Sequence, residues 1–507
     1  MIDVVICVHN GLDAVIQCLN SIQNNTTQKI NLIIIDDGSD QTTRRYLEQY
    51  TRQFHYKLIR HAKPQGYTAS ANQGLKQSTS RYCVLLNSDT IVTSQWLERL
   101  TETMESDNRI GIVGPLSNAA SWQSIPHRDR NRNGLEPNLT IEQMAELVYQ
   151  ASDKNFPRVM FLNGFCLMIK REVIEKIGYF DEKNFPVGYG EEDDYCLRAR
   201  AANFKLKVAT HCYIYHQKSA SFGTDRRKKL VQNGKAALYR KHGEERVKRS
   251  VQKMVEHRSL KETRAKLKWL LACRRQIITG NQRKNVIYTA ITGNYDKLQD
   301  PLHLSKHCDY YCFTDNPKLK SGTWKIIMLD KIFADTARQA RWVKVMPHLL
   351  FPTYKYSVWV DGNIRIVGDI DRFIEKYSAT SPLVFYKHSH RNCIYKEAEA
   401  CIALGKDKKD VILKQVALYK NAGYPRDNGL IESGVILRRH NDPIVTGTMT
   451  TWWRQIISYS KRDQISFNYV AWKNNVPFTA INGNIRNNEF FNWSKHHNKP
   501  VMKRLKR

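Results

Sequence analysis

The sequence predicts an α/β protein with two large sheet domains joined by a basic helical connector. Short β-branched runs alternate with helix-like segments over residues 1–224, and a second pattern of this kind covers residues 285–492. Residues 225–284 are strongly basic and have apolar residues at helical spacing. Residues 493–507 form a basic, apolar-poor end that we expect to be a frayed tail.

Short apolar runs define the strands of the first domain. They are Val4–Val8, Leu32–Ile35, Lys57–Ile59, Tyr82–Leu86, Ile110–Val113 and Phe165–Ile169. The early runs are each followed by a polar turn and an amphipathic stretch, such as Asp13–Gln23 and Thr42–Phe54. This alternation indicates a mostly parallel, doubly wound sheet, which binds ligands at the carboxyl ends of its strands. We expect the polar segment Trp122–Asn138 to form a loop over that crevice.

The connector holds about half of the protein's excess charge. Residues 225–284 contain 20 Lys and Arg against 5 Asp and Glu, a net +15 out of the +32 of the whole chain. Val247, Val251, Met254 and Val255 recur at helical spacing in this segment. The pattern suggests a face for an anionic membrane or a lipid-diphosphate acceptor, although a solvated linker helix explains it about as well.

The second domain repeats the alternation of strands and helices. Its expected strands include Val286–Ala290, Tyr310–Phe313, Trp324–Met328, Ser357–Val360 and Leu383–Tyr386. No repeat of solenoid period is visible, but the two domains could share one architecture.

Composition limits the class of protein. No run approaches the roughly 18 apolar residues that span a bilayer. The chain opens on an apolar strand pattern without a basic leader, which argues against secretion. The 11 cysteines are scattered and form no CxxC pair, as expected of reduced thiols in a cytoplasmic protein. The positive charge suggests an anionic partner. A nucleic acid is disfavoured, because the basic residues are not interleaved with aromatic residues and no known nucleic-acid-binding motif is recognisable.

Polar clusters fall where strands of the first domain end. They are Asp36-Asp-Gly-Ser-Asp40, Asn87-Ser-Asp89, Gly190-Glu-Glu-Asp-Asp194 and His216. Carboxylates at these positions could bind a nucleotide, hold a divalent ion that bridges a diphosphate, or abstract a proton. Each cluster alone has a plainer reading, because such sequences also form turns, solvated faces and helix N-termini.

Together and in this order, the clusters resemble an inverting family 2 glycosyltransferase with the GT-A fold. Further matching text is Val5-Ile-Cys-Val-His-Asn10, Gly66-Tyr-Thr-Ala-Ser-Ala-Asn-Gln-Gly74, Ile177-Gly-Tyr-Phe-Asp-Glu182 and His216-Gln-Lys-Ser219. The resemblance covers nearly all of residues 1–224 and implies a nucleotide-sugar donor with Mg²⁺ or Mn²⁺.

The resemblance also implies a role for each cluster. Asp37 holds the nucleotide base, and His9, Asn10 and Asn87 lie on the donor side. Asp89 is the expected metal ligand, and His216 is expected to be a further contact to the metal or the diphosphate. Glu192 is the expected general base, with Glu191 and Asp193 as alternatives.

Two positions depart from the family pattern. Asn87 replaces the first carboxylate of the DXD element, which leaves fewer charges to hold the metal. Pro64 stands where relatives often carry Asn, so the sugar-side contacts there are less certain.

The second domain resembles the glycosyltransferase-like domain of plant alkaline ceramidase TOD-type and mucilage-related proteins. The matching text is Tyr288-Thr-Ala-Ile-Thr-Gly-Asn-Tyr-Asp296, Tyr311-Cys-Phe-Thr-Asp-Asn316, Trp359-Val-Asp-Gly-Asn363, Gly429-Leu-Ile-Glu432 and Arg462-Asp-Gln-Ile-Ser466. The resemblance implies that Asp361 and Asn363 lie near a metal, and that Asp463, followed by Gln464, lies near donor or acceptor.

Plainer and rival readings stand beside this one. Asp361-Gly362 is also a favoured hairpin pair, and Trp452-Trp453 is more typical of a core than of a sugar platform. A zinc amidase would need clustered ligands, for which His388, His390 and His440 are modest candidates.

The sequence thus predicts a bifunctional hexosyl- or deoxyhexosyltransferase that builds a cell-surface glycan such as a capsule or O-antigen. The acceptor would be a glycan or lipid-linked glycan, with peripheral membrane association through residues 225–284. One active domain with an acceptor-binding second domain, a nucleic-acid-binding protein and a polysaccharide-assembly scaffold are the alternatives. We expect no nucleic-acid partner.

Overall fold

The chain folds into two compact units, Met1–Lys268 and Trp269–Arg507. The structure is a computed structural model that describes residues 1–130, 132–152, 154, 156–218, 224–280, 283–330, 333 and 335–494. Most of the predicted basic tail therefore lies outside the described residues. No described helix is both long and apolar enough to cross a membrane.

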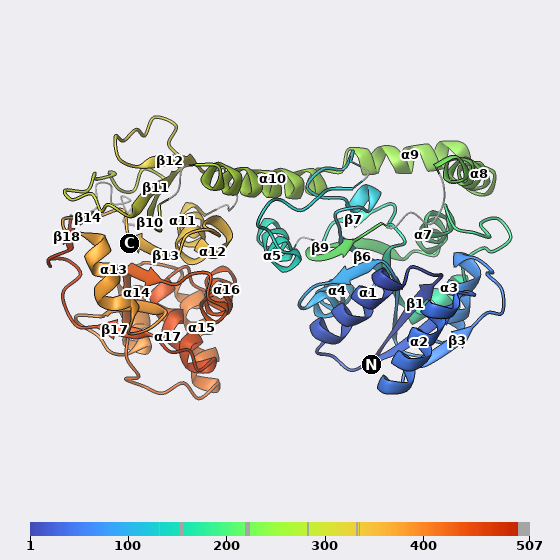
Figure 1. Cartoon of the computed structure of the whole chain (residues 1–507), viewed down its shortest axis with the longest axis horizontal. Coiled ribbons are helices and arrows are strands. Elements are labelled where there is room, and N and C mark those ends of the chain that lie inside the picture. Colours follow the sequence, from blue (N-terminus) through green and yellow to red (C-terminus); the bar gives the residue numbers. More distant parts are fainter. Residues whose placement is uncertain are drawn as a thin grey trace, which may run out of the picture. The chain divides into compact units, whose positions relative to one another are not determined.

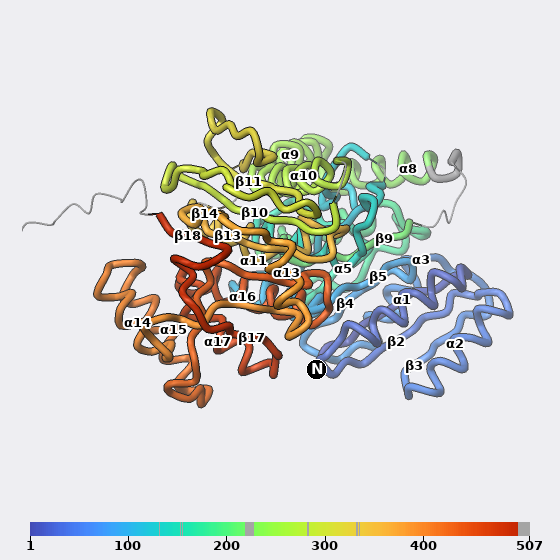
Figure 2. Tube along the Cα trace, turned by 60° about the vertical axis from the view of Figure 1, so that its left-hand side comes forward, coloured from blue at the N-terminus to red at the C-terminus, as the bar shows by residue number. Residues whose placement is uncertain are grey.

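In the described residues, the first unit contains a nine-stranded sheet (Figure 1). Its strands are β1 (Ile2–Val8), β2 (Ile30–Asp36), β3 (Lys57–Arg60), β4 (Tyr82–Asn87), β5 (Thr90–Val92), β6 (Ile110–Leu116), β7 (Arg158–Val159), β8 (Cys166–Lys170) and β9 (Lys205–His216). The helices are α1 (Leu12–Asn25), α2 (Gln41–Phe54), α3 (Tyr67–Gln77), α4 (Trp96–Glu105), α5 (Ile141–Ala151), α6 (Arg171–Ile177) and α7 (Glu191–Ala201), followed by α8 (Thr224–His242) and α9 (Glu244–Val255). Helices α1 and α2 lie side by side near the N-terminus (Figure 2).

The described part of the second unit contains a seven-stranded sheet and a separate pair of strands. The seven strands are β10 (Asn285–Ile291), β11 (Cys308–Thr314), β12 (Lys325–Met328), β13 (Tyr356–Val360), β15 (Leu383–Lys387), β16 (Ile431–Arg438) and β17 (Thr479–Ile481). The pair is β14 (Ile364–Ile366) and β18 (Phe491–Trp493). The helices are α11 (Thr336–Val345), α12 (Pro347–Leu350), α13 (Ile370–Ser378), α14 (Ile394–Ala403), α15 (Lys409–Asn421), α16 (Pro443–Ser458) and α17 (Asp463–Lys473).

The two sheets have the same topology. In the first the order is β3-β2-β1-β4-β8-β6-β9, and in the second it is β12-β11-β10-β13-β16-β15-β17. In each sheet one strand, β8 or β16, runs antiparallel to both of its neighbours, whereas the other strands of that order run parallel to one another. The α/β class predicted from the sequence is confirmed, and the two units share one architecture.

The central strands are apolar because both of their faces are covered. Val4, Val5, Ile6 and Val8 of β1 are buried, as expected for a parallel strand with helices on either side. The one carboxylate in β1, Asp3, is buried too. Burial would raise its pKa, but hydrogen bonds, chiefly from Ser80, lower the pKa to about 2.

The predicted connector is helical, and its first part packs within the first unit. Val247 and Met254 of α9 are buried, and the Met160 N–H lies 3.2 Å from the Met254 Sδ. The apolar stripe that suggested a membrane face is therefore used inside the protein. Helix α10 (Arg258–Ile278) begins in the first unit and ends in the second.

Helix α8 approaches the start of α7 closely at Gly234. A Cβ atom on Gly234 would lie 1.8 Å from the carbonyl oxygen of Tyr189, which precedes Gly190 at the N-terminus of α7. Only glycine allows this approach, so the basic helix α8 supports the acidic start of α7.

We expect Gly234→Ala to destabilise the first unit by about 1–3 kcal/mol, because the added methyl group forces α8 away from α7. Calorimetric unfolding of the whole chain measures the change. Gly447→Ala in α16 is the control, since a Cβ there meets nothing within 4 Å. This change should raise the free energy of unfolding by up to about 1 kcal/mol, because alanine is the better helix former. Equal melting temperatures for Gly234→Ala and wild type would contradict the close approach.

Candidate active sites

Asp37 holds together the loops at the carboxyl end of β2. Its two carboxylate oxygens accept the N–H groups of Gln65 and Gly66, each at 2.8 Å, and His61 Nδ1 lies 2.7 Å from Oδ1. Burial raises the pKa of Asp37, but these hydrogen bonds outweigh it and lower the pKa below its ordinary value. Asp37 is thus a charged carboxylate that orders the loop before α3. A nucleotide base could donate hydrogen bonds only to the lone pairs of Asp37 that these contacts leave free.

Pro64 lies in that loop and packs on a glycine. A Cβ atom on Gly38 would lie 2.8 Å from Pro64 N, and Gly38 has a φ of 66°. Gly38 thus allows both the left-handed turn and the close contact. The sequence analysis noted that Pro64 departs from the family pattern. It missed the buried His61, because a single His in a loop does not by itself indicate a structural or functional role.

His9 and Asn10 join the end of β1 to the same turn. The His9 Nδ1–H donates to the Asp37 carbonyl oxygen at 2.8 Å. The Asn10 N–H donates to Ser39 Oγ at 2.9 Å, and Asn10 Oδ1 accepts the Asp40 N–H at 2.7 Å. The structure therefore brings His9, Asn10 and Asp37 together, as their assignment to the donor side requires.

Asp89 and His216 lie opposite each other because β5 pairs with the end of β9. His216 Nε2 is 3.1 Å from Asp89 Oδ1. His216 Nδ1 is 2.9 Å from the Ala119 carbonyl oxygen, which can only accept, so Nδ1 carries a proton. Nε2 therefore faces the carboxylate with either a second proton or a lone pair that a cation could use.

This pair fits a divalent metal bound jointly with substrate. Imidazole nitrogen and carboxylate oxygen are both common metal ligands, and Asn87 ends the neighbouring strand β4. Among the described residues, no three His, Cys, Asp or Glu side chains converge on one point. Diphosphate oxygens and water would supply the remaining ligands, as is usual for Mg²⁺.

The loop predicted to cover the crevice is connected to His216 through Asn118. The Asn118 side chain bonds both backbone groups of His216, at 2.7 and 3.0 Å. The Asn133 side-chain amide donates to the Asn118 carbonyl oxygen at 2.9 Å, and buried Arg264 of α10 donates to the carbonyls of Trp122 and Ser124. The loop is therefore tied to the metal pair and to α10.

The acidic cluster forms the first turn of α7. Glu191 is buried and its Oε2 has no hydrogen-bond partner, whereas Glu192 Oε2 accepts the Gly190 N–H at 3.3 Å. Burial raises the pKa of Glu191, Glu192 and Asp193, and repulsion from Glu192 raises that of its two neighbours further. Carboxylates with raised pKa values are suited to accept a proton near neutral pH.

Asp194 differs from its neighbours because cations surround it. Arg198 lies 2.8 Å from it, and Lys241 and His242 of α8 lie 2.8 and 2.7 Å from its other oxygen. Burial raises its pKa, but these partners outweigh the effect and lower the pKa. Asp194 therefore fixes α8 to α7 and leaves the other three carboxylates as candidate bases.

Gly164 and Phe165 connect the acidic cluster to the metal pair. A Cβ atom on Gly164 would lie 3.5 Å from Glu192 Cβ, and the Phe165 ring stacks on His216 with centroids 5.4 Å apart. Adjacent Cα atoms are only about 3.8 Å apart, so Glu192 and His216 lie at the same edge of the sheet. That these side chains act in one site stays a prediction.

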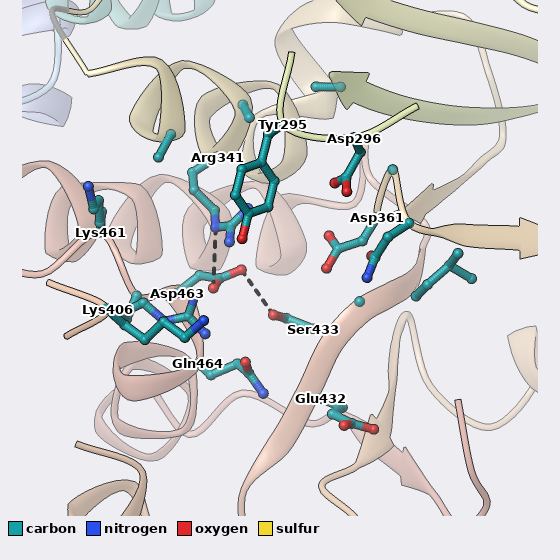
Figure 3. Close-up of a pocket in the computed structure, with 18 of the residues that line it drawn as sticks. Tyr295, Asp296, Arg341, Asp361, Lys406, Glu432, Ser433, Lys461, Asp463 and Gln464 are labelled. Atoms are coloured by element: carbon teal, nitrogen blue, oxygen red, sulfur yellow. Dashed lines mark hydrogen bonds and ion pairs between the residues drawn. The ribbon is translucent and has the colours of Figure 1, made fainter. Parts of the chain in front are cut away.

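The second unit has a cavity of about 900 Å³ at the corresponding edge (Figure 3). Asp361, Asn363, Asp463 and Gln464, all predicted from the sequence, line this cavity. Sequence reasoning missed other polar groups in or beside it, which are Asp296, Arg341, Lys344, Glu432 and Ser433. Trp452 and Trp453 are fully buried, as core residues are.

Asp463 is neutralised by cations. Its Oδ2 is 2.7 Å from Lys344 Nζ and accepts a hydrogen bond from Ser433 at 2.9 Å, and its Oδ1 is 3.3 Å from Arg341 Nε. Burial would raise the pKa of Asp463, but Arg341 and Lys344 hold it far below its ordinary value. An aspartate in this state is a poor proton acceptor.

The Lys344 ammonium also lies beside Asp361. It is 3.3 Å from Asp361 Oδ1, which accepts the Trp359 indole N–H at 2.7 Å. A divalent metal held jointly by Asp361 and Asp463 would have to displace this buried cation against like-charge repulsion. That pair of carboxylates does not fit a metal.

Equivalent backbone bonds relate the two sites. The Asn87 N–H donates to the Phe165 carbonyl in the first unit, and the Asp361 N–H donates to the Gly434 carbonyl in the second. Asp361 thus corresponds to Asn87. Counting back along the reversed strands, Ser433 corresponds to Gly164 and Glu432 to Asn163.

Comparison with known proteins matches two parts of the chain to two different family models. Residues 3–178 match the model of Glycosyl transferase family 2. Residues 274–496 match the model described as TOD1/MUCI70, glycosyltransferase-like domain. The chain joins two glycosyltransferase-type domains. The family resemblances seen in the sequence are confirmed.

Individual relatives match one part of the chain. The probable hexosyltransferase MUCI70 of Arabidopsis thaliana is 29% identical over 218 residues, which is 37% of this chain and 37% of the relative. Glycosyltransferase GlyG of Streptococcus pneumoniae serotype 4 is 21% identical over 229 residues, 44% of this chain and 72% of the relative. This chain thus spans little more than a third of the length of MUCI70.

Among solved structures, the mannosyltransferase PcManGT from Pyrobaculum calidifontis, in complex with GDP-Man and Mn²⁺, is 14% identical. The match covers 55% of this chain and 76% of that one, with a TM-score of 0.38.

We expect Asp463→Asn to destabilise the second unit by about 3–5 kcal/mol, because it leaves Lys344 and Arg341 without their shared counter-charge. Asp427→Asn, which removes an exposed pair with Lys396, should cost under about 1 kcal/mol. Calorimetry of both variants measures the difference.

The same pair predicts an acid dependence. The folded-state pKa of Asp463 lies below its unfolded value, so its stabilisation is present at neutral pH and is lost as the pH falls below about 3.9. The melting temperature of Asp463→Asn should therefore fall less than that of wild type over this acid range. Parallel curves would contradict the ion pair.

Proposed function

We propose that this chain is a bifunctional glycosyltransferase, in which each unit transfers a sugar from a nucleotide-sugar donor. The observation that carries this proposal is the shared topology. In both units a polar strand-tip turn, after β4 or β13, lies beside a carboxylate at the start of a helix, α7 or α17. Ligands of such sheets bind at this edge.

In the first unit the donor would bind between the Asp37 loop and the strand-tip turn. Asp37, His9 and Asn10 would hold the nucleotide, with its diphosphate near Asn87, Asp89 and His216. A metal held by Asp89 and His216 would supply positive charge for the departing diphosphate. The sequence departure at Asn87 makes joint binding of metal and donor the natural order.

Glu192 would take the proton of the acceptor hydroxyl. The hydroxyl oxygen then attacks the anomeric carbon while the bond to the nucleoside diphosphate breaks on the opposite face. One displacement inverts the anomeric configuration. The raised pKa of Glu192 and its position beside Gly164 support this role.

The acceptor would be a growing cell-surface glycan, free or lipid-linked. Helices α8 to α10 present much of the chain's excess positive charge. With Val247 and Met254 of α9 buried, attraction to an anionic membrane or to a lipid diphosphate would be mainly electrostatic and sensitive to salt. We place the enzyme at the cytoplasmic side of such a membrane.

One observation favours a second candidate function. Asp463 begins α17 as Glu191 begins α7, but the cations around Asp463 make it a poor proton acceptor. If no other group replaced it, the second unit would bind acceptor without catalysis.

We expect Glu192→Gln to lower transfer by the first unit about 10²–10⁴-fold, because the amide cannot accept the proton. The affinity for the nucleoside diphosphate should stay nearly unchanged, since this isosteric change adds no bulk. Mass analysis of products and calorimetric titration of the nucleotide measure the two effects. Glu175→Gln on exposed α6 is the control, and equal activity of both variants would refute the role of Glu192.

We expect Asp89→Asn to raise the Mn²⁺ concentration that half-saturates transfer about 10–100-fold, because the metal loses its one charged protein ligand. The measurement is a Mn²⁺ titration of the initial rate at fixed donor. Asp13→Asn on α1 provides a matched loss of one negative charge. An unchanged half-saturation point in Asp89→Asn would show that Asp89 is no ligand.

A further inference from the structure

Glu432 is one of the polar groups of the second cavity to which the resemblance assigned no role. It lies at the start of β16 and is one of the residues that line the cavity (Figure 3). Its relative exposure is only 8%, and its Oε2 atom is buried without a hydrogen-bond partner. A buried carboxylate oxygen without a partner is costly, and such groups in native proteins mark functional positions.

The charged surroundings of Glu432 differ from those of Asp463. The nearest cation is Arg486, whose Nη2 is 4.0 Å from Glu432 Oε1 and whose side chain is half exposed. Arg391, His390 and Asp361 act on Glu432 only at longer range. Burial outweighs the attraction of the cations and raises the pKa of Glu432.

The corresponding position in the first unit is neutral. Glu432 corresponds to Asn163, whereas Asp463 begins α17 as Glu191 begins α7. In the first unit the helix carries the carboxylates that lack cationic partners, and the strand carries an amide. In the second unit the strand carries a carboxylate whose ion-pair contact is the long one to half-exposed Arg486, and the helix carries one held at short range by buried Lys344 and by Arg341.

We propose that Glu432 is the general base of sugar transfer in the second unit. This inference rests on the proposed function of that unit. The acceptor hydroxyl gives its proton to the Glu432 carboxylate as its oxygen bonds to the anomeric carbon. The bond from that carbon to the diphosphate breaks, and its electron pair leaves with the diphosphate. The product has the inverted configuration.

Lys344 and Asp463 act as positioning residues in this scheme. Ser433 follows Glu432 on β16 and donates to Asp463, which the Lys344 ammonium fixes in turn. Lys344 also donates to Ser433 at 3.1 Å. Through Ser433, the Lys344–Asp463 ion pair thus fixes the strand backbone beside Glu432. The Lys344 ammonium would also keep the negative charge of Asp463 neutralised when donor phosphates bind nearby.

The test uses the full chain with Glu192→Gln, so that transfer by the first unit is suppressed. Glu432→Gln in this background should lower the remaining transfer about 10²–10⁴-fold. The dissociation constant for the nucleoside diphosphate at the second unit should change less than about twofold, and an unchanged calorimetric unfolding profile of the full chain would show that this unit is folded. Glu399→Gln, an exposed residue on neighbouring α14, is the matched control and should keep full activity.

Chemical rescue separates a base from a structural residue. Azide is an anionic nucleophile that needs no deprotonation, so Glu432→Ala supplied with azide should regain turnover and form a glycosyl azide of inverted configuration. A structural defect would not be rescued in this way.

Three results would overturn the inference. Transfer by Glu432→Gln within tenfold of its parent, or a product of retained configuration, removes Glu432 as the base while leaving the second unit active. A Glu192→Gln parent that binds nucleoside diphosphate at the second unit but transfers no sugar from any donor refutes the bifunctional proposal itself, and the base assignment falls with it.

Discussion

The reversal of one strand in each sheet is the constraint on which both sites depend. Because β8 runs against β4, and β16 against β13, the segment that enters the reversed strand lies beside the tip of its neighbour. One backbone hydrogen bond fixes this contact in each unit, from Asn87 to Phe165 and from Asp361 to Gly434. It places the strand-tip turn within reach of the helix that carries the acidic residues, although the two are distant in sequence. All side-chain chemistry at this edge is added to that backbone arrangement.

The fold was largely predictable because its signals are local. Strands such as β1 and β4 are short apolar runs followed by polar turns, and the class of architecture depends on little more. What could not be predicted was the use of the apolar stripe on α9. Helical spacing shows that Val247 and Met254 share a face, but only the fold decides whether that face meets lipid or protein.

Site residues divide in the same way. Asp37, Asp89 and Glu192 lie in motifs next to strand ends, so the sequence alone singles them out. Lys344 and Glu432 received no role from the sequence, since a lysine in α11 and a glutamate at the start of β16 look like ordinary helix and strand residues. Their importance follows from contacts between distant parts of the chain. Lys344 pairs with Asp463, 119 residues further on, and Ser433, next to Glu432, donates to Asp463 across 30 residues. Sequence also could not reveal that Asp463 is paired with two cations.

Charge compensation explains why the two units can share a backbone and yet differ in chemistry. In the scheme proposed for the first unit, a divalent ion would arrive with its substrate and leave with the product, and Asp89 also has His216 as a partner. A buried ammonium such as Lys344 is permanent, and a buried aspartate beside it is stabilised only as a charged partner. Lys344 holds Asp463 in this ion pair, so in the scheme proposed for the second unit the proton would be transferred to a carboxylate outside the pair. Glu432 lies on the adjacent strand and lines the cavity, and it has no buried ammonium as a partner, which makes it the carboxylate that this constraint favours.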